Sequence, residues 1–261
     1  MGVVSDAGLS VTVLGCSGTY AAPGGACSGY LLRSAATAVW LDCGSGTLGN
    51  LQRHVSLVDL DGIVVSHSHP DHWLELPVVL NALRYGFDEP RRDLPVLWTA
   101  KTAELFHAVV GRDPRPVLAP RVVDERSTAT IGDIELRFSR TDHPVETLAV
   151  RAESDGRSIV YSADTGDGWR LASLGPDIGR AIDLAVVEAT LDESEAGAVQ
   201  HLTASQAGRQ AAEAGVASLL LTHLAPGSDA DARRADAART FDGPIAVAEI
   251  DATHEARGAP T

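Results

Sequence analysis

Four residues that can bind a metal ion fall within six positions of the chain, as His67, His69, Asp71 and His72. Neutral imidazole and carboxylate are ligands that zinc and similar divalent metals prefer. A short apolar run at residues 63–65 precedes the pattern, and helix-like sequence follows it. On an extended segment His67 and His69 point to the same side and can hold one ion. Asp71 and His72 stand where the helix begins and can face a second ion. The pattern therefore predicts metal-dependent chemistry rather than a solvated loop.

Charge and composition limit the partners of such a site. The 261 residues include 35 acidic and 21 basic side chains, for a formal net charge of -14. Nucleic-acid phosphates require clustered Arg and Lys, so we expect no extended nucleic-acid surface. No apolar run approaches the ~20 residues that cross a bilayer, so we expect no membrane partner. Cys16, Cys27 and Cys43 have no Cys-x-x-Cys spacing, which favours reduced thiols and a cytoplasmic protein.

The elements that position these residues alternate along the chain. Hydrophobic patterns predict strands at residues 9–14, 30–33, 38–42, 63–65, 96–99, 131–139, 148–153, 157–161, 183–187, 217–221 and 245–250. Helices are predicted at residues 48–54, 74–85, 102–110, 204–214 and 229–240. No linker-like stretch divides this series. We therefore expect an α/β fold in a single domain over residues 1–261, with short flexible termini.

Acidic and histidine residues also follow other predicted strands. Asp42 ends a strand ahead of glycines, where it could orient a neighbouring loop, cap the next helix, or do both. His143 follows the strand at 131–139, Asp164 the strand at 157–161, and His223 the strand at 217–221. Taken alone, such a histidine is usually structural and an Asp-Thr-Gly segment is usually a turn. Their shared position at strand ends makes them candidate ligands.

The His-x-His-x-Asp-His run and the order of these later residues resemble the metallo-β-lactamase superfamily of dinuclear metallohydrolases. The resemblance implies a four-layer αββα sandwich with the metals at one edge of its two sheets. It also implies two divalent ions, foremost Zn²⁺ with Mn²⁺, Fe²⁺ or Co²⁺ as alternatives, and gives Asp42 the role of orienting the ligand loops. The first ion would take His67, His69, His143 and Asp164, and the second Asp71, His72, His223 and the other oxygen of Asp164.

Two further segments, at residues 187–190 and 201–203, resemble the ribonuclease Z branch of this superfamily. In that branch a Glu and a His pair beside the metals, and the His protonates the leaving oxygen. The expected catalytic residues are therefore Glu188 and His201, with Asp71 as a ligand that also moves a proton. The alternative is that His201 caps a helix and Glu188 is a surface acid. The tRNA-processing enzymes carry a long arm between the third histidine and the bridging acid, where this chain has one predicted hairpin.

From about residue 9 to about residue 250, the chain resembles the actinobacterial atypical class II cyclic-nucleotide phosphodiesterases, notably at residues 11–18, 51–54, 220–223 and 241–244. This resemblance implies a homodimer that hydrolyses a small phosphodiester, such as 3′,5′-cyclic AMP, to the 5′-monophosphate. Gly18, Thr19 and Ser28 of the first Gly/Ser-rich loop would contact phosphate or ribose, unless that loop is a plain surface loop. The alternatives are an RNA phosphodiesterase like ribonuclease Z, a lactone, ester or β-lactam hydrolase, and an inactive metal-binding scaffold.

Overall fold

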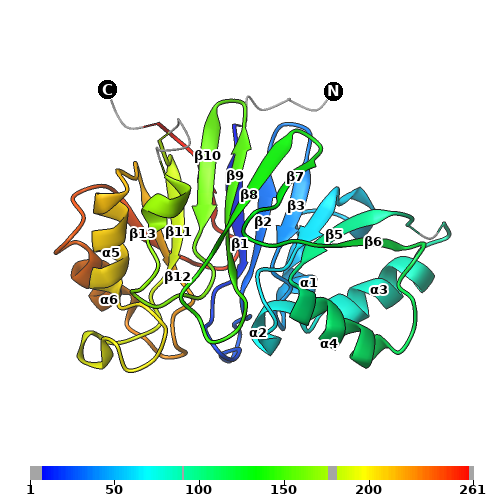
Figure 1. The fold of residues 1–261 in the computed structure, drawn as a ribbon, viewed down its shortest axis with the longest axis horizontal. Helices are drawn as coiled ribbons and strands as arrows, with labels where there is room; N and C mark the ends of the chain where they lie inside the picture. Colours follow the sequence, from blue (N-terminus) through cyan, green and yellow to red (C-terminus); the bar gives the residue numbers. More distant parts are fainter. Residues whose placement is uncertain (1–7, 90, 176–180, 259–261) are drawn as a thin grey trace.

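Two mixed β-sheets pack face to face, and helices cover both outer faces (Figure 1). The computed structural model describes residues 8–89, 91–175 and 181–258, so the termini expected to be flexible lie outside it. In order across the first sheet, the strands are β14 (Thr253–Glu255), β1 (Ser10–Gly15), β2 (Gly29–Arg33), β3 (Ala38–Leu41), β4 (Gly62–Val64), β5 (Leu94–Trp98) and β6 (Leu118–Val122). In the second sheet they are β13 (Ile245–Val247), β12 (Leu219–Thr222), β11 (Leu184–Glu188), β10 (Arg157–Tyr161), β9 (Leu148–Ser154), β8 (Ile134–Arg140) and β7 (Thr128–Ile131).

The helices divide between the two outer faces in sequence order. Those of the first half lie on the first sheet, and are α1 (Thr47–Leu51), α2 (Pro70–Trp73), α3 (Leu76–Tyr85) and α4 (Ala100–Val110). Those of the second half lie on the second sheet, and are α5 (Ala204–Glu213) and α6 (Ala230–Ala237). The layers therefore run helix, sheet, sheet, helix, which confirms the predicted αββα sandwich. Among the described residues, no helix is long and apolar enough to span a bilayer.

The core between the sheets follows from strand periodicity. In β8 the buried Ile134, Leu136 and Phe138 alternate with exposed charged residues, so one face of the strand points inward. These side chains join a cluster with residues of the first sheet such as Val11 and Leu32. Each large apolar side chain buried in this way contributes about 1.5–3 kcal/mol of transfer free energy. The inner cluster thus holds the two sheets together beneath the strand ends.

Several element boundaries differ from those predicted. The helix expected at 74–85 is α3 alone, because Pro77 is accommodated only in the first turn of a helix that starts at Leu76. The strand expected at 131–139 is two strands, because Gly132 has a φ of 55° and turns the chain between β7 and β8. Strands β6 and β14 were not predicted, since β6 contains Pro120 and β14 has only three residues.

Parallel pairing brings the ends of distant strands to one edge. Strands β10, β11 and β12 are parallel neighbours, with Tyr161 opposite Val186 and Glu188 opposite Thr222. In the first sheet β3, β4 and β5 are likewise parallel. The Tyr30 hydroxyl on β2 lies 2.6 Å from the Thr222 hydroxyl on β12, a hydrogen bond that joins the sheets. Residues that follow β4, β10 and β12 therefore meet at the same edge of the sandwich.

Candidate metal centre

The ligand-type residues predicted from the sequence lie together in two groups. Within each group, one potential ligand atom from every residue lies within 4.8 Å of those from the others. The first group is His67, His69, His143 and Asp164. The second group is Asp71, His72 and His223. The segment between β4 and α2 supplies His67 and His69, and α2 itself supplies Asp71 and His72. The other three residues follow the ends of β8, β10 and β12.

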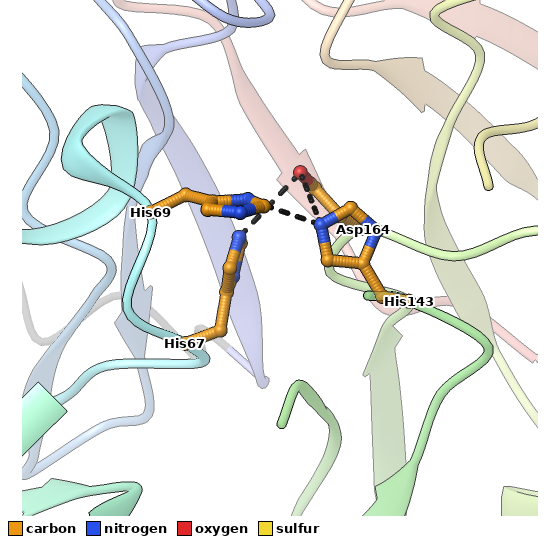
Figure 2. A group of neighbouring side chains, drawn as sticks. All are labelled: His67, His69, His143 and Asp164. Atoms are coloured by element: carbon orange, nitrogen blue, oxygen red, sulfur yellow. Dashed lines mark hydrogen bonds and ion pairs between the residues drawn. The ribbon is translucent and has the colours of Figure 1, made fainter. Parts of the chain in front are cut away.

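The first group converges on a single point between the two sheets (Figure 2). The Nε2 atom of His143 lies 3.0 Å from Nδ1 of His69. Oδ2 of Asp164 lies 3.6 Å from Nε2 of His67 and 3.8 Å from Nε2 of His143. Imidazole nitrogens and a carboxylate oxygen at such mutual distances can ligate one cation.

Asp164 also faces the second group, through its other oxygen. Oδ1 lies 3.3 Å from Nε2 of His72 and 3.4 Å from Nε2 of His223. Oδ2 of Asp71 lies 3.3 Å from the same His223 nitrogen. One carboxylate thus contacts both groups, which is the arrangement that a bridging ligand of two cations requires.

Two buried atoms in the cluster indicate a cation. Among the described residues, His67 Nε2 and Asp164 Oδ1 are buried side-chain atoms without a hydrogen-bond partner. An unsatisfied buried polar group costs roughly 1–3 kcal/mol, which metal coordination would offset. Burial, reinforced by the charge of His72, holds the pKa of His67 well below its usual range. The imidazole is therefore neutral, the form that binds a metal, and the residues fit a divalent-metal centre.

Asp42 connects the ligand segments from beneath the cluster. Its Oδ1 accepts a hydrogen bond from the Ser66 amide at 2.7 Å. Its Oδ2 lies 2.7 Å from Nδ1 of His72 and accepts a hydrogen bond from the Tyr161 hydroxyl at 2.9 Å. Such contacts fix the orientation of His72 and of the backbone before His67. The N-cap alternative fails, because Gly46 precedes α1 and no side chain caps it by a hydrogen bond.

Left-handed backbone conformations occur where strands reach the centre. Asp42, Ala163 and His223 have φ values of 59°, 49° and 53°. Residues other than glycine rarely adopt this region, and each costs about 1–3 kcal/mol. Each of the three directly follows a strand or lies beside a ligand residue. The surrounding packing thus maintains local strain that turns His223 and Asp164 towards the cluster.

Glu188, which is buried, and His201, which is partly exposed, form a pair next to the ligand groups. Oε1 of Glu188 lies 2.8 Å from Nδ1 of His201. The His201 ring stacks on that of His223, with centroids 5.6 Å apart. Burial lowers the pKa of His201, but the hydrogen bond and charge of Glu188 outweigh it and raise this pKa to about 9. His201 can therefore carry a proton at neutral pH beside the cluster.

Thr190 is a residue of the site that the sequence analysis did not single out. Its hydroxyl donates a hydrogen bond to Oε2 of Glu188 at 2.7 Å and lies 2.9 Å from Nδ1 of His223. One hydroxyl thus joins the acidic partner of His201 to a ligand residue. A threonine two positions after the strand-end Glu188 was the available signal, since a β-branched hydroxyl there can bond back to that carboxylate.

Of the three residues that were expected to contact substrate from the first Gly/Ser-rich loop, Gly18 and Thr19 lie at the cluster. The Thr19 amide donates a hydrogen bond to Oδ2 of Asp71 at 2.9 Å. A Cβ on Gly18 would lie 2.7 Å from the His223 carbonyl oxygen, so the close approach requires glycine. Ser28 is fully buried. The loop therefore places Thr19 and the backbone of Gly18 at the cluster, whereas the Ser28 side chain is enclosed by the protein.

Comparison with known proteins identifies relatives over most of the chain. The Beta-lactamase superfamily domain matches residues 37–224. The probable metallo-hydrolase YhfI of Bacillus subtilis is 31% identical over 243 residues, which are 92% of this chain and 97% of the relative. The crystal structure of YhfI matches with a TM-score of 0.84 at 30% identity, over 95% of this chain and 98% of that one. The fold thus has a solved counterpart.

Two further relatives match the chain at 32% identity. Uncharacterized protein Rv1339 of Mycobacterium tuberculosis is 32% identical over 260 residues, covering 96% of this chain and 93% of the relative. Ribonuclease Z of Kineococcus radiotolerans is 32% identical over 251 residues, covering 76% of this chain and 77% of the relative. From the matched domain, the relatives and the ligand clusters, the chain belongs to the β-lactamase superfamily, as a metal-dependent hydrolase of its ribonuclease Z-like branch.

Proposed function

We propose that the protein is a phosphodiesterase that hydrolyses a 3′,5′-cyclic nucleotide, foremost cyclic AMP, to the 5′-monophosphate. The observation that carries this proposal is the Glu188–His201 pair, 2.8 Å apart and beside the ligand groups. An alkoxide leaves poorly unless it is protonated, and a histidine held as a proton donor provides for that step. Esters with good leaving groups need no such donor. The pair therefore favours a phosphodiester as substrate.

The proposed cofactors are two divalent cations, with zinc as the first choice for a shell of five histidines and two acids. His67, His69 and His143 would hold one ion, and Asp71, His72 and His223 the other. Asp164 would contact both, as the distances from its two oxygens support. When bound, two such ions activate water and neutralise charge that develops on the phosphate.

The proton steps fall to two residues of the chain. Water attacks phosphorus, and the bond from phosphorus to the 3′-oxygen breaks. His201 donates a proton to that oxygen, while Glu188 retains the hydrogen bond to Nδ1 and stabilises the charged ring. Burial opposes ionisation of Asp71, but its hydrogen bond with His223 outweighs this and holds the carboxyl pKa well below its usual range. Asp71 is thus ionised and can accept a proton from water.

The connection between His143 and Asp164 supports a small substrate. Strands β9 and β10 fill this connection as a hairpin, with Val150 opposite Tyr161 and a turn at Asp155 and Gly156. A net charge of -14 also opposes binding of a long polyanion. We further propose a cytoplasmic homodimer. The three free thiols, all of them in described residues, are consistent with a reducing compartment.

A second candidate is cleavage of RNA, which the 32% identity to ribonuclease Z of Kineococcus radiotolerans favours. A lactone, ester or β-lactam hydrolase is the remaining alternative within the superfamily. It predicts that loss of His201 leaves the reaction rate unchanged. The three candidates thus differ in substrate and in their dependence on one side chain.

The first test is incubation of the zinc-loaded protein with cyclic AMP, followed by chromatography for AMP. We expect AMP from the native protein and at least a 100-fold lower rate from the His67→Ala/His69→Ala variant. Cleavage of bis(p-nitrophenyl) phosphate without AMP would reject the cyclic nucleotide but retain the chemistry. Cleavage of a precursor tRNA alone would establish the second candidate. Hydrolysis of a lactone alone would overturn the proposal.

A further inference from the structure

The turn at residues 17–20 is held directly against the ligand cluster. The Gly18 amide donates a hydrogen bond to the Leu224 carbonyl oxygen at 2.9 Å, and Ser17 forms a parallel bridge with Leu224. Thr19 has a φ of 66° and donates its amide hydrogen to Asp71. The turn is therefore fixed by contacts to Asp71 and to the residue after His223, both of the second ligand group, and Tyr20 directly follows Thr19.

Tyr20 is the last residue of this turn. Its amide donates a hydrogen bond to the Gly18 carbonyl oxygen at 2.7 Å, and its Cα lies about 3.8 Å from that of Thr19. The residue is 61% exposed. A large aromatic residue that is left open to solvent adds little to the stability of the core. It is therefore available to a bound molecule.

Val199 is a second exposed apolar residue, and it lies in the loop between β11 of the second sheet and α5. His143 Nδ1 lies 3.1 Å from the Gln200 carbonyl oxygen, and the His201 amide donates to the Val199 carbonyl oxygen at 2.8 Å. Val199 is 54% exposed. The loop that carries it and the loop between β1 and β2 lie at the same end of the sandwich (Figure 1). Exposed apolar residues thus occur one position after Thr19, which contacts Asp71, and one position before Gln200, which contacts His143.

We propose that Tyr20 and Val199 form a rim that holds the nucleobase of the substrate, with the base stacked on the Tyr20 ring. This inference rests on the proposed cyclic-nucleotide phosphodiesterase activity. Stacking on an aromatic face requires no positive charge, so an acidic protein can bind the base by this contact while the metal centre takes the phosphate. A purine offers a larger face than a pyrimidine, and the rim therefore favours cyclic AMP or cyclic GMP over cyclic CMP.

The test compares substrates with and without a base. Tyr20→Ala should raise KM for cyclic AMP roughly 5- to 20-fold, at the lower end of base–aromatic stacking, and change kcat less than about 2-fold. KM for ribose 3′,5′-cyclic phosphate, which lacks a base, should not change. Tyr20→Phe and Tyr20→Trp should retain the native KM, and Val199→Ser should raise it less than Tyr20→Ala does.

The matched control is Tyr85→Ala, because Tyr85 is 68% exposed but lies at the end of α3. It should leave both KM values unchanged. If Tyr20→Ala raised KM equally for both substrates, or for neither, the proposal that this rim holds the nucleobase would be wrong. Native protein that cleaves neither substrate would instead reject the proposed function, so the two failures are distinguishable.

Discussion

At the residue scale, the hydrogen bonds of Glu188 explain why His201 has a fixed position. Oε1 accepts the Thr165 amide at 2.7 Å as well as His201, and Oε2 accepts the Leu202 amide at 3.2 Å. The carboxylate is fully buried. A carboxylate that accepts several hydrogen bonds from surrounding donors is fixed in orientation. It can thus orient the His201 ring without itself taking part in bond breaking.

This arrangement predicts that the rate loss caused by removing His201 depends on the leaving group of the substrate. His201→Ala should lower kcat for cyclic AMP about 10²- to 10⁴-fold, the range of general-acid catalysis. For bis(p-nitrophenyl) phosphate the loss should stay below about 10-fold, because nitrophenolate leaves without protonation. Steady-state rates on both substrates measure the difference. His107→Ala, on the outer helix α4, is the control and should leave the rates on both substrates unchanged. Equal losses on both substrates would mean that His201 serves the metal centre instead.

At the element scale, Asp133 joins two turns at the end of the sandwich away from the metals. Its Oδ1 accepts hydrogen bonds from Ser34 and Thr37 in the turn between β2 and β3, and Oδ2 accepts one from Ser154 on β9. These hydroxyl bonds, that of Ser34 foremost, hold the pKa of the Asp133 carboxyl below its ordinary value. The ionised carboxylate therefore links the first sheet to the second.

The hydrogen bonds of Asp133 predict that the native protein and the Asp133→Asn variant differ in stability by an amount that depends on pH. A depressed folded-state pKa stabilises the fold above the ordinary carboxyl pKa, ~3.9, and this contribution disappears as pH falls through the lower folded-state pKa. Asp133→Asn should therefore cost about 1 kcal/mol at pH 7, a small value because the side chain is exposed, and should approach the native stability near pH 3. Urea unfolding at both pH values measures this. Glu135→Gln, exposed on β8, is the control, and a pH-independent loss in Asp133→Asn would contradict the assignment.

The elements and the site were not equally predictable. Hydrophobic patterns predicted β8 and β9, and ligand-type residues at strand ends predicted the metal cluster, because both signals are local in sequence. Strand β14 and the contact of Thr19 with Asp71 depend on pairing between distant segments, which no local pattern records. Thr190 was missed for a related reason. Its role arises from β11 and β12 lying side by side, which brings His223 next to its hydroxyl.

At the scale of the whole molecule, the metal centre joins the two halves of the sandwich. The first sheet supplies His67 through His72, and the second supplies His143, Asp164 and His223. A cation that binds only the folded chain stabilises it by about 2.7 kcal/mol at a concentration 100 times Kd. Chelation should therefore lower Tm by roughly 5–10 °C for a chain of this size.

Calorimetry with a chelator, and then with added zinc, tests this expectation. The His67→Ala/His69→Ala variant should respond less to both additions, and an equal response would place the stabilising metal elsewhere. The metal-dependent part of Tm should shrink at acidic pH, since protonated imidazole cannot ligate a cation. Burial lowers the pKa of the first group's histidines, so their contribution should persist to pH values below ~6.5.

The order in which segments meet has a consequence for biosynthesis. Strand β1 pairs with β14, Ser10 opposite Glu255, and the turn after β1 is held by Leu224. A ribosome releases the chain from its N-terminus, so β1 keeps an open edge until almost all of the described chain has been made. The turn that carries Tyr20 likewise stays unanchored. Exposed strand edges promote aggregation, and we expect the nascent protein to depend on chaperones until β14 docks.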